Sequence, residues 1–522
     1  MKKMLKSIVS LLLVLMLLAS TATVLAEGYK VIIKNENANI TIVGSEFNFY
    51  KLFSVAYNTT TDAITYSYDD TCVAAEYNGK SGNDLIPVIE NMTTEEINEF
   101  AAQLYANRGS TPTYTETATS ETLEMMIDAP GYYLVTVTVK NTNGAEDKNT
   151  NGAEVKDTVV SRAILVSVYQ DETTIALKAD APGLTKEILH NELNTWGSVG
   201  DNASEDIIYY QITTTVCDTT GYTKYDYIIH DIMDPGLTLY APETIEIADL
   251  DKKYYTVTTT CDDGDTFEVK VDILQAVADG VLKAGDQLVT TCSAVLNKNA
   301  KIYSEGHNDN VAYLEYSNNV YDTKSTGATP EVKVYDWTFK ADVKKADDQG
   351  NTLAGAIFVL SKSNNLSVTY DAENGLSSTD DLIPFVVDGT KYMPAQDVDE
   401  STVFVIDASE FTLYYLDDAV TYYLYEVQEP AGYSKLQNPI SIKITAEYNN
   451  IGDEIKKTLL AVSGDQGAWK VDEETNVISV INVSGSVLPS TGGMGTTVFY
   501  VIGGVLVLGA VVIMLLRRRT NK

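Results

Sequence analysis

The chain has 522 residues and a formal net charge of −36 at pH 7, from 37 Lys and Arg against 73 Asp and Glu. Its length suggests about three domains, and a 44% share of hydrophobic residues indicates a folded protein rather than a disordered acidic tail. The negative charge excludes nucleic acid as an expected partner, and three scattered histidines disfavour both a histidine metal cage and a Ser/His/Asp relay.

Residues 1–26 have the three parts of a secretory signal peptide. Lysines stand at positions 2, 3 and 6, an apolar run follows at 8–18, and the segment closes on Val24-Leu25-Ala26. The apolar run is too short to serve as a retained membrane anchor. We therefore expect export, with cleavage after Ala26.

The exported body is predicted to consist almost entirely of β-strands. Alternating β-branched and aromatic runs, separated by turn signals, occur at 29–34, 132–140, 207–216, 254–260, 312–316, 421–427 and 477–483. This pattern predicts an all-β fold of tandem Ig-like sandwich domains, which we place at 27–172, 173–333 and 334–485. In the first of these, the hexapeptide NTNGAE occurs at 141–146 and again at 149–154, which predicts a mobile hairpin tip.

Two helices are expected among the strands. Thr93 and Glu96 have the spacing of a capping box, and the apolar residues that follow at helical spacing are Ile97, Phe100, Ala101 and Leu104. This helix should pack against the first sandwich. A shorter helix is expected over 271–278.

The second domain contains a lysine, an acid and an asparagine that are candidates for one core site. The segment PGLTK at 182–186 resembles the PxxxK strand opening of the middle domains of pilus shaft subunits. The resemblance implies an amide bond between Lys186 and Asn318, assisted by Asp231, with Asn319 as the alternative if a bulge shifts the strand. A solvated lysine with ordinary turn asparagines is the competing interpretation. No comparable set is found in the first domain.

In the third domain, strand periodicity directs three polar side chains toward the core. Lys345, Glu426 and Asn482 each share a strand face with apolar residues two and four positions before them. An unpaired buried ammonium group is costly, so Lys345 must either find a partner or lose its proton.

The segments around these residues resemble a known family. The sequence from Lys345 to Phe358 resembles the opening of a CnaB-type (SpaA-like) pilin domain, and Glu426 followed by PAGY at 430–433 is similar to its E-box, although VQE at 427–429 departs from the usual small residues. The resemblance implies a spontaneous amide bond between Lys345 and Asn482, with Glu426 as assisting acid and no cofactor. A buried salt bridge between Lys345 and Glu426 fits the same pattern.

The four cysteines and the acidic turns carry weaker signals. Export permits a disulfide, and Cys217 with Cys292 is the pair considered first, although reduced and packed cysteines are equally compatible. The acidic run at 262–265 lacks the spaced ligands of a calcium loop, so we predict no metal site.

The C-terminal region has three parts in a fixed order. Leu488-Pro489-Ser490-Thr491-Gly492 precedes an apolar stretch at 498–516 that is long enough to span a bilayer, and three arginines follow at 517–519. This order resembles the cell-wall sorting signal of Gram-positive surface proteins. It implies that sortase cuts after Thr491 and transfers the chain, so that residues 486–522 hold it in the membrane only before sorting.

Together these features favour a structural protein, the shaft subunit of a sortase-assembled pilus, with sortase, other pilin subunits and peptidoglycan as partners. The alternative is a monomeric wall-anchored adhesin for a host or dietary ligand. Many shaft pilins carry a YPK motif whose lysine joins the subunits, but this chain has Val168-Tyr169-Gln170-Asp171 there. Lys178 is the nearest substitute, expected to face solvent; an ordinary solvated lysine is the competing reading.

Overall fold

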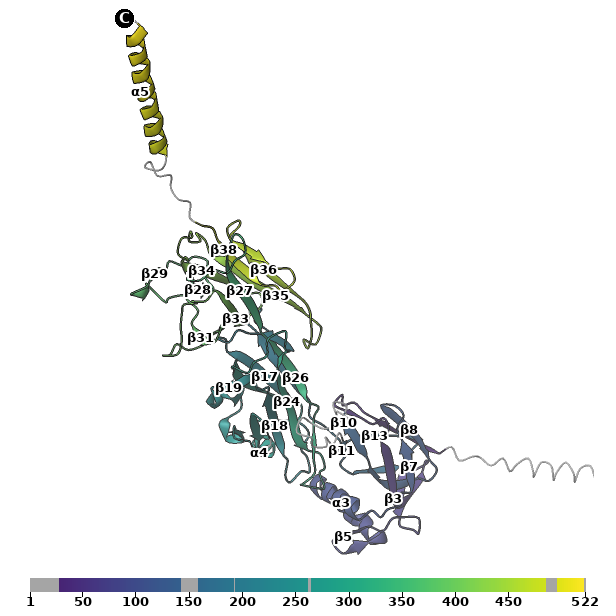
Figure 1. Cartoon of the computed structure of the whole chain (residues 1–522). Coiled ribbons are helices and arrows are strands. Elements are labelled where there is room, and N and C mark those ends of the chain that lie inside the picture. The colour runs from purple at the N-terminus through teal and green to yellow at the C-terminus, as the bar shows by residue number, and fades with distance from the viewer. Residues whose placement is uncertain (1–27, 142–157, 192, 262–263, 485–494, 521–522) are drawn as a thin grey trace, which may run out of the picture. The chain divides into compact units, whose positions relative to one another are not determined.

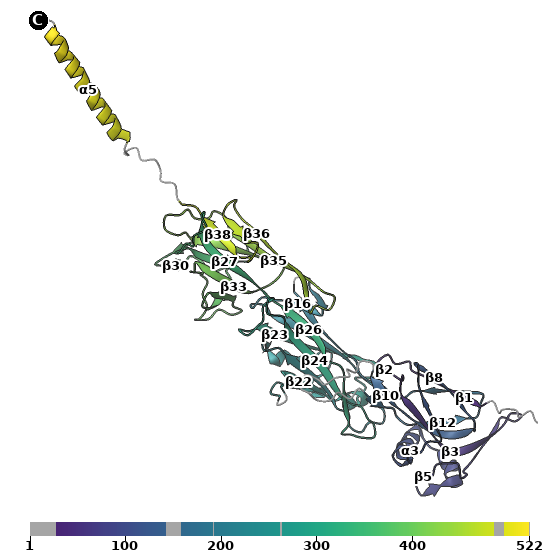
Figure 2. The ribbon, with the colours of Figure 1, turned by 45° about the vertical axis from the view of Figure 1, so that its right-hand side comes forward.

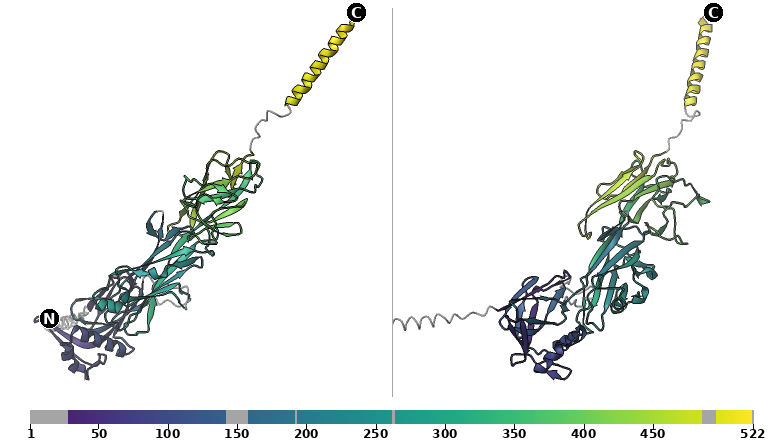
Figure 3. Two further views of the ribbon diagram at one scale, coloured as in Figure 1. Left: turned by 90° about the vertical axis from the view of Figure 1, so that its left-hand side faces the viewer. Right: turned by 180° about the vertical axis from the view of Figure 1, so that it is seen from behind.

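The computed structural model describes residues 28–141, 158–191, 193–261, 264–484 and 495–520, and strands are their predominant secondary structure (Figures 1 and 3). The chain divides into two compact units. The first comprises the described residues up to Phe339 together with Tyr415–Asp418 and Ala446–Thr458, and the second comprises the remaining described residues. The all-β prediction is confirmed.

The first domain contains three small sheets, with strand orders β13-β1-β8, β11-β10-β2 and β12-β9-β3-β4 (β7 also pairs with β3), and a two-stranded sheet of β5 and β6. Its strands are β1 (Tyr29–Lys34), β2 (Ile40–Thr41), β3 (Glu46–Asn58), β4 (Ala63–Ser67), β5 (Glu76–Tyr77), β6 (Lys80–Ser81), β7 (Tyr114–Thr117), β8 (Thr122–Ile127), β9 (Gly131–Thr136), β10 (Thr138–Asn141), β11 (Thr158–Val160), β12 (Ile164–Val168) and β13 (Glu172–Ala176). Short helical turns η1 (Gly82–Leu85) and α2 (Ile86–Ile89) lead toward its main helix.

The predicted helix of the first domain is confirmed as α3 (Thr94–Asn107). The Thr93 hydroxyl accepts from the Glu96 backbone N–H at 3.2 Å, and the Glu96 carboxylate accepts from the Thr93 N–H at 2.8 Å, which completes the capping box. Phe100, Ala101 and Leu104 are buried in the same apolar cluster as residues of β3 and β9. The expected face therefore packs against the first domain.

The middle domain is a sandwich of two larger sheets, ordered β15-β14-β17-β23-β19 and β16-β26-β24-β18-β22-β21 (Figure 1). Its strands are β14 (Leu184–His190), β15 (Thr195–Gly197), β16 (Val199–Asp201), β17 (Ile208–Thr215), β18 (Tyr227–Met233), β19 (Leu237–Tyr240), β20 (Glu246–Ile247), β21 (Tyr255–Thr258), β22 (Phe267–Val271), β23 (Gln287–Leu296), β24 (Asn308–Ser317), β25 (Thr326–Ala328) and β26 (Val332–Trp337). Its helical segments are η2 (Pro242–Thr244), η3 (Lys252–Tyr254) and α4 (Ile273–Ala278), so the shorter predicted helix starts two residues later than expected.

The third domain pairs a sheet of order β31-β32-β33-β27-β38-β37 with one of order β28-β34-β35-β36. Its strands are β27 (Phe339–Asp347), β28 (Ile357–Ser361), β29 (Tyr370–Asp371), β30 (Gly375–Leu376), β31 (Phe385–Asp388), β32 (Lys391–Pro394), β33 (Glu410–Leu416), β34 (Thr421–Gln428), β35 (Ile440–Tyr448), β36 (Ile455–Ser463), β37 (Trp469–Val471) and β38 (Ile478–Asn482). The first strand, β27, runs parallel to the last, β38, with Lys345 opposite Val480 (Figure 2).

Strand pairing moves both expected domain boundaries toward the C-terminus. β13 pairs in parallel with β1, so the first domain extends to Ala176, and β26 pairs with β24 and β16, so the middle domain extends to Trp337. The NTNGAE repeats lie largely outside the described residues. The strands that flank them, β10 and β11, pair antiparallel as a hairpin requires.

The C-terminal segment forms helix α5 (Gly495–Thr520). Among the described residues, no helix combines the length and apolar character needed to cross a membrane. The span expected at 498–516 is therefore not confirmed by the structure.

Candidate functional site

Lys345, Glu426 and Asn482 meet in the core of the third domain. Lys345 extends from β27, Asn482 ends the adjacent strand β38, and Glu426 comes from β34 in the facing sheet. The Lys345 Nζ lies 3.9 Å from Glu426 Oε1, and Asn482 Nδ2 donates to Glu426 Oε2 at 2.9 Å. One carboxyl group thus contacts the amine with one oxygen and the amide nitrogen with the other.

Burial moves the two titratable groups of this site toward their neutral forms. Lys345 and Glu426 are 0% and 5% exposed. Burial lowers the pKa of Lys345 to about 8, against the opposing charge of Glu426, and burial raises the pKa of Glu426. The Lys345 amine also donates to the Val480 carbonyl at 2.9 Å, which holds it beside the last strand. With a pKa of about 8, part of the Lys345 amine is uncharged near neutral pH, and that uncharged form can act as a nucleophile toward the neighbouring amide.

In the middle domain, Lys186 and Asp231 meet as expected. The Lys186 amine on β14 donates to Asp231 Oδ2 on β18, so the contact links the two sheets, and both side chains are fully buried. The amine also lies 5.5 Å from the centre of the Tyr210 ring. Burial raises the pKa of Asp231, while the Lys186 charge and the nearby Asn310 amide oppose that shift.

Asn318 does not belong to this site, which corrects the prediction made from the sequence. Asp231 pairs with Ala312, and Asn318 lies six positions further along the chain, about 20 Å away at roughly 3.3 Å per residue. Its side chain instead donates to the Thr158 carbonyl at 2.9 Å and accepts from the Ser325 hydroxyl at 2.8 Å. The alternative, Asn319, is more distant still.

Asn310, rather than Asn318, is the asparagine that lies beside Asp231. It pairs with Met233, two positions from Asp231 along β18, so Asn310 and Asp231 share a face as diagonal neighbours. Asn310 is 0% exposed, and within the described residues neither of its amide atoms makes a hydrogen bond of normal geometry, although the amide lies close enough to Asp231 to lower the pKa of that carboxyl. A buried amide without partners is unfavourable unless it has another role.

A second buried carboxyl, that of Asp336 on β26, lies near the middle-domain site. Its Oδ1 accepts from the Asn202 amide at 2.6 Å, and its Oδ2 has no hydrogen-bond partner among the described residues. Burial raises the pKa of Asp336 to about 8, and the charge of Asp206 adds to this shift. The side chain is therefore mostly protonated at neutral pH.

Asp336→Asn should remove a pH-dependent cost of folding. Because the folded-state pKa of Asp336 is raised, its contribution is fully favourable below the unfolded-state value near 4 and is lost as the pH rises to about 8. The variant's advantage in unfolding free energy over the wild type should thus grow between pH 4 and pH 8, by on the order of 1 kcal/mol per pH unit, and should stay constant above pH 8. Paired thermal denaturation curves across this range test it; a constant difference would contradict it.

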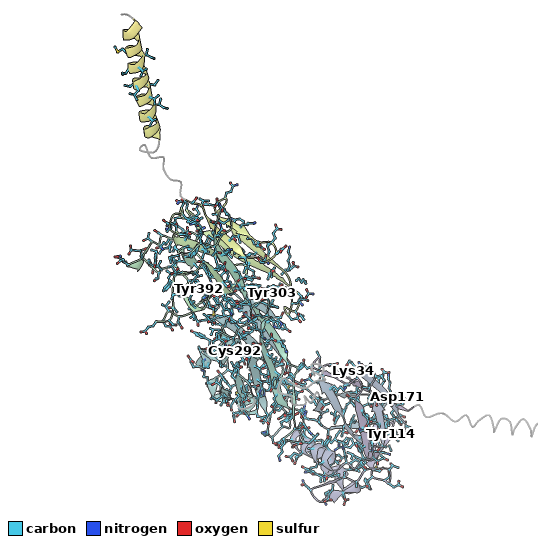
Figure 4. All side chains as sticks on the ribbon, viewed as in Figure 1. Lys34, Tyr114, Asp171, Cys292, Tyr303 and Tyr392 are labelled. Atoms are coloured by element: carbon cyan, nitrogen blue, oxygen red, sulfur yellow. The ribbon has the colours of Figure 1, made fainter. Side chains whose placement is uncertain are left out.

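The sequence predicts that Lys178 faces solvent. In the structure its side chain is instead half-buried. It follows the end of β13, and its carbonyl accepts from the Arg162 N–H at 3.1 Å. It lines a groove of about 790 Å³, and Lys34 at the end of β1 lines the same groove. Figure 4 labels Lys34 in the first domain. Burial, with a smaller effect of the Arg162 charge, lowers the pKa of Lys178.

Cys217 and Cys292 are both buried and form no disulfide, so the pairing considered from the sequence is not present in the described structure. Cys292 pairs with Tyr210 across β17 and β23, whereas Cys217 lies seven positions beyond Tyr210, roughly 20 Å away along the strand direction. Figure 4 marks Cys292 within the middle domain. The sorting motif, Leu488 to Gly492, lies outside the described residues.

Two parts of the sequence match models of known families. Residues 339–458 match the SpaA family, described as a prealbumin-like fold domain, and this stretch includes Lys345 and Glu426 but ends before Asn482. Residues 481–522 match the LPXTG cell wall anchor motif of Gram-positive proteins. Comparison with curated proteins gives no match.

Several solved structures have a similar architecture at low sequence identity. The T6 backbone pilin of Streptococcus pyogenes is 15% identical, with 88% of this chain and 98% of that chain covered and a TM-score of 0.46. The major pilin SpaD of Corynebacterium diphtheriae is 16% identical, with the same coverage and TM-score. The major pilin SpaA of that organism is 14% identical over 87% of this chain and 100% of that chain, with a TM-score of 0.41. At these values the similarities assign no function.

Proposed function

We propose that this cell-wall-anchored surface protein is the shaft subunit of a sortase-assembled pilus, with two of its domains reinforced by internal amide bonds. The observation that carries the proposal is the pair of buried Lys–acid–Asn groups, one in the middle domain and one in the third, in a chain that also matches a wall anchor. Such bonds suit a polymer that transmits tension from subunit to subunit.

In the third domain the reaction joins Lys345 to Asn482. The neutral Lys345 Nζ attacks Cγ of Asn482, a C–N bond forms, and the Asn482 C–Nδ2 bond breaks to release ammonia. Glu426 is placed to take the proton of the attacking amine on Oε1 and to supply one to the departing nitrogen from Oε2. No cofactor is needed, because the enclosed geometry holds the reacting groups together.

In the middle domain the same exchange would join Lys186 to Asn310, with Asp231 as the assisting acid. Asp231 Oδ2 contacts the amine, and its Oδ1 is buried and makes no hydrogen bond within the described chain. That free oxygen is available to the Asn310 amide on the same face. The bond would connect β14 and β24, which belong to opposite sheets of the sandwich.

The mature chain should therefore weigh less than its sequence by two molecules of ammonia. Asn310→Ala should restore one of them. Asn318→Ala is the matched control, because it removes an equally buried asparagine of the same strand region that contacts Thr158 rather than Asp231.

Intact-mass spectrometry and a crosslinked peptide from a protease digest measure these differences. A wild-type mass equal to that of the sequence would overturn both bonds. Loss of the middle-domain bond in Asn318→Ala but not in Asn310→Ala would return the assignment to Asn318.

Assembly requires an amine that accepts the sorted chain. Lys178 is proposed for this role: its Nζ would attack the acyl-enzyme formed at Thr491 of another copy, making an amide and releasing sortase. The groove around Lys178 and the lowered pKa of its amine support the proposal. A boiled wall extract probed with antibody should show a ladder of multimers, and a single species would favour the wall-anchored adhesin instead.

A further inference from the structure

A histidine on the outer face of the middle domain is enclosed by carboxylates. His230 lies on β18, and its side chain points away from the core face that carries Asp231. Although it belongs to an outer face, His230 is 4% exposed, and Asp265, in the loop before β22, is 7% exposed. Burial of this kind on an outer face requires partners for the imidazole.

Three acidic side chains from different elements converge on the ring. The His230 Nδ1 lies 2.5 Å from Asp265 Oδ2 and 3.7 Å from Glu268 Oε1, the latter on β22. On the other side, Nε2 lies 3.6 Å from Glu315 Oε2 on β24, a separation at which this buried nitrogen makes no hydrogen bond. Tyr313 stacks on the ring, with centroids 4.4 Å apart and planes within 3°.

The Nδ1 side has the spacing of a metal-ligand set. One atom each from His230, Asp265 and Glu268 lie within 4.8 Å of one another. Ligands bound tetrahedrally to one cation at 2.0–2.2 Å lie about 3.4 Å apart, so small side-chain rotations would bring these three atoms to the distances that a bound cation requires. The stacked Tyr313 ring fixes the plane of the imidazole, so Nδ1 is held between the two carboxylates.

We propose that His230, Asp265 and Glu268 bind a divalent transition-metal cation of the zinc type, through His230 Nδ1 and two carboxylate oxygens. One imidazole with carboxylates suits Zn²⁺ better than Ca²⁺, which takes oxygen ligands only. Glu315 faces Nε2 from 3.6 Å, and a small approach would let its carboxylate accept a hydrogen bond from the Nε2 N–H, which is the usual role of a carboxylate behind a metal-bound histidine. The site fastens β18 to β22 and to the loop before it, on the face opposite the Lys186 site.

Binding must displace a proton. The 2.5 Å distance between Nδ1 and Asp265 Oδ2 is that of a hydrogen bond, so a cation that enters replaces the Nδ1 proton, and the two ligand atoms separate by a small side-chain rotation. With three carboxylates around it, the metal-free ring carries a proton on each nitrogen; the Nδ1 proton leaves to solvent while Nε2 keeps its own, so metal binding here is coupled to the release of about one proton. This coupling gives the experiment a readout that surface binding to scattered carboxylates lacks.

The test is calorimetric titration of the chelator-treated mature chain with ZnCl₂, in two buffers that differ in ionisation enthalpy. The wild type should show one saturable site, about one proton released and a higher melting temperature with the metal. His230→Gln and Glu268→Gln should each weaken binding at least tenfold, and Glu315→Gln should weaken it about tenfold without abolishing it.

His307→Gln is the matched control. His307 Nδ1 also contacts an aspartate, Asp309, but in the part of the chain that the structure describes no second carboxylate joins that pair in a metal-ligand set. This variant should bind Zn²⁺ as the wild type does. Absence of saturable binding in the wild type, or equal binding in Glu268→Gln, would overturn the proposal and identify His230 as an imidazolium clamped by carboxylates. The circular dichroism spectrum and metal-free melting temperature of each variant verify that the domain has folded.

Discussion

Glu426→Gln should leave the third domain folded but without its amide bond. Glutamine has nearly the same shape as the glutamic acid it replaces and can still contact Asn482, but it cannot move a proton between Lys345 and the departing nitrogen. The variant should keep one more ammonia than the wild type. Without the bond, β27 and β38 are held only by non-covalent contacts, namely their ladder hydrogen bonds and the burial of side chains such as Val343 and Val480.

The expected loss of stability is large. The bond closes a loop of more than 100 residues, and the chain-entropy model used for disulfides values such a loop at about 4 to 5 kcal/mol. Glu426→Gln and Asn482→Ala should therefore unfold at lower temperature than the wild type and should be cleaved faster by trypsin.

Glu429→Gln is the matched control for this change. Glu429 is exposed and lies directly after the end of β34, three residues from Glu426. Its charge is the smallest of the named causes that shift the pKa of Glu426. It should retain the bond and the wild-type melting temperature. If Glu426→Gln still forms the bond, the carboxyl is not the proton carrier; if the unbonded variants resist trypsin as well as the wild type, the bond is not what protects the domain.

The two internal sites differ in how far the sequence could predict them. In the third domain, alternation along each strand places Lys345, Glu426 and Asn482 on core faces, and the structure brings all three together. In the middle domain the same rule places Asn310 and Asn318 on one face, because they are eight positions apart. Periodicity predicts which face of the sheet a side chain lies on, but it does not predict the register between strands. The register, in which Asp231 pairs with Ala312, determines which asparagine lies beside Asp231.

Long-range pairing also explains the other differences. The end of the first domain depends on β13 pairing in parallel with β1, a contact between segments about 140 residues apart that no local pattern announces. The His230 cluster was missed for the same reason, since its acids come from a loop and two strands. By contrast the capping box of α3 is a local signal, and it predicted the helix start correctly.

Lys178→Arg should abolish the ladder of multimers while the chain still reaches the wall as a monomer. The change keeps the positive charge beside Arg162, but a guanidinium does not lose its proton near neutral pH and cannot attack an acyl-enzyme. Lys178 has the properties that the reaction needs, because it is half-buried in the groove and its pKa is lowered by that burial.

Lys34→Arg is the matched control, since Lys34 lines the same groove but is exposed at the end of β1. Immunoblots of boiled wall extracts should show the wild-type ladder in Lys34→Arg and none in Lys178→Arg, with equal amounts of surface protein. A ladder that persists in Lys178→Arg and disappears in Lys34→Arg would move the joint across the groove to β1. A ladder that persists in both would place the accepting amine outside the groove, and Lys178 would then be an ordinary half-buried lysine whose lowered pKa follows from burial alone.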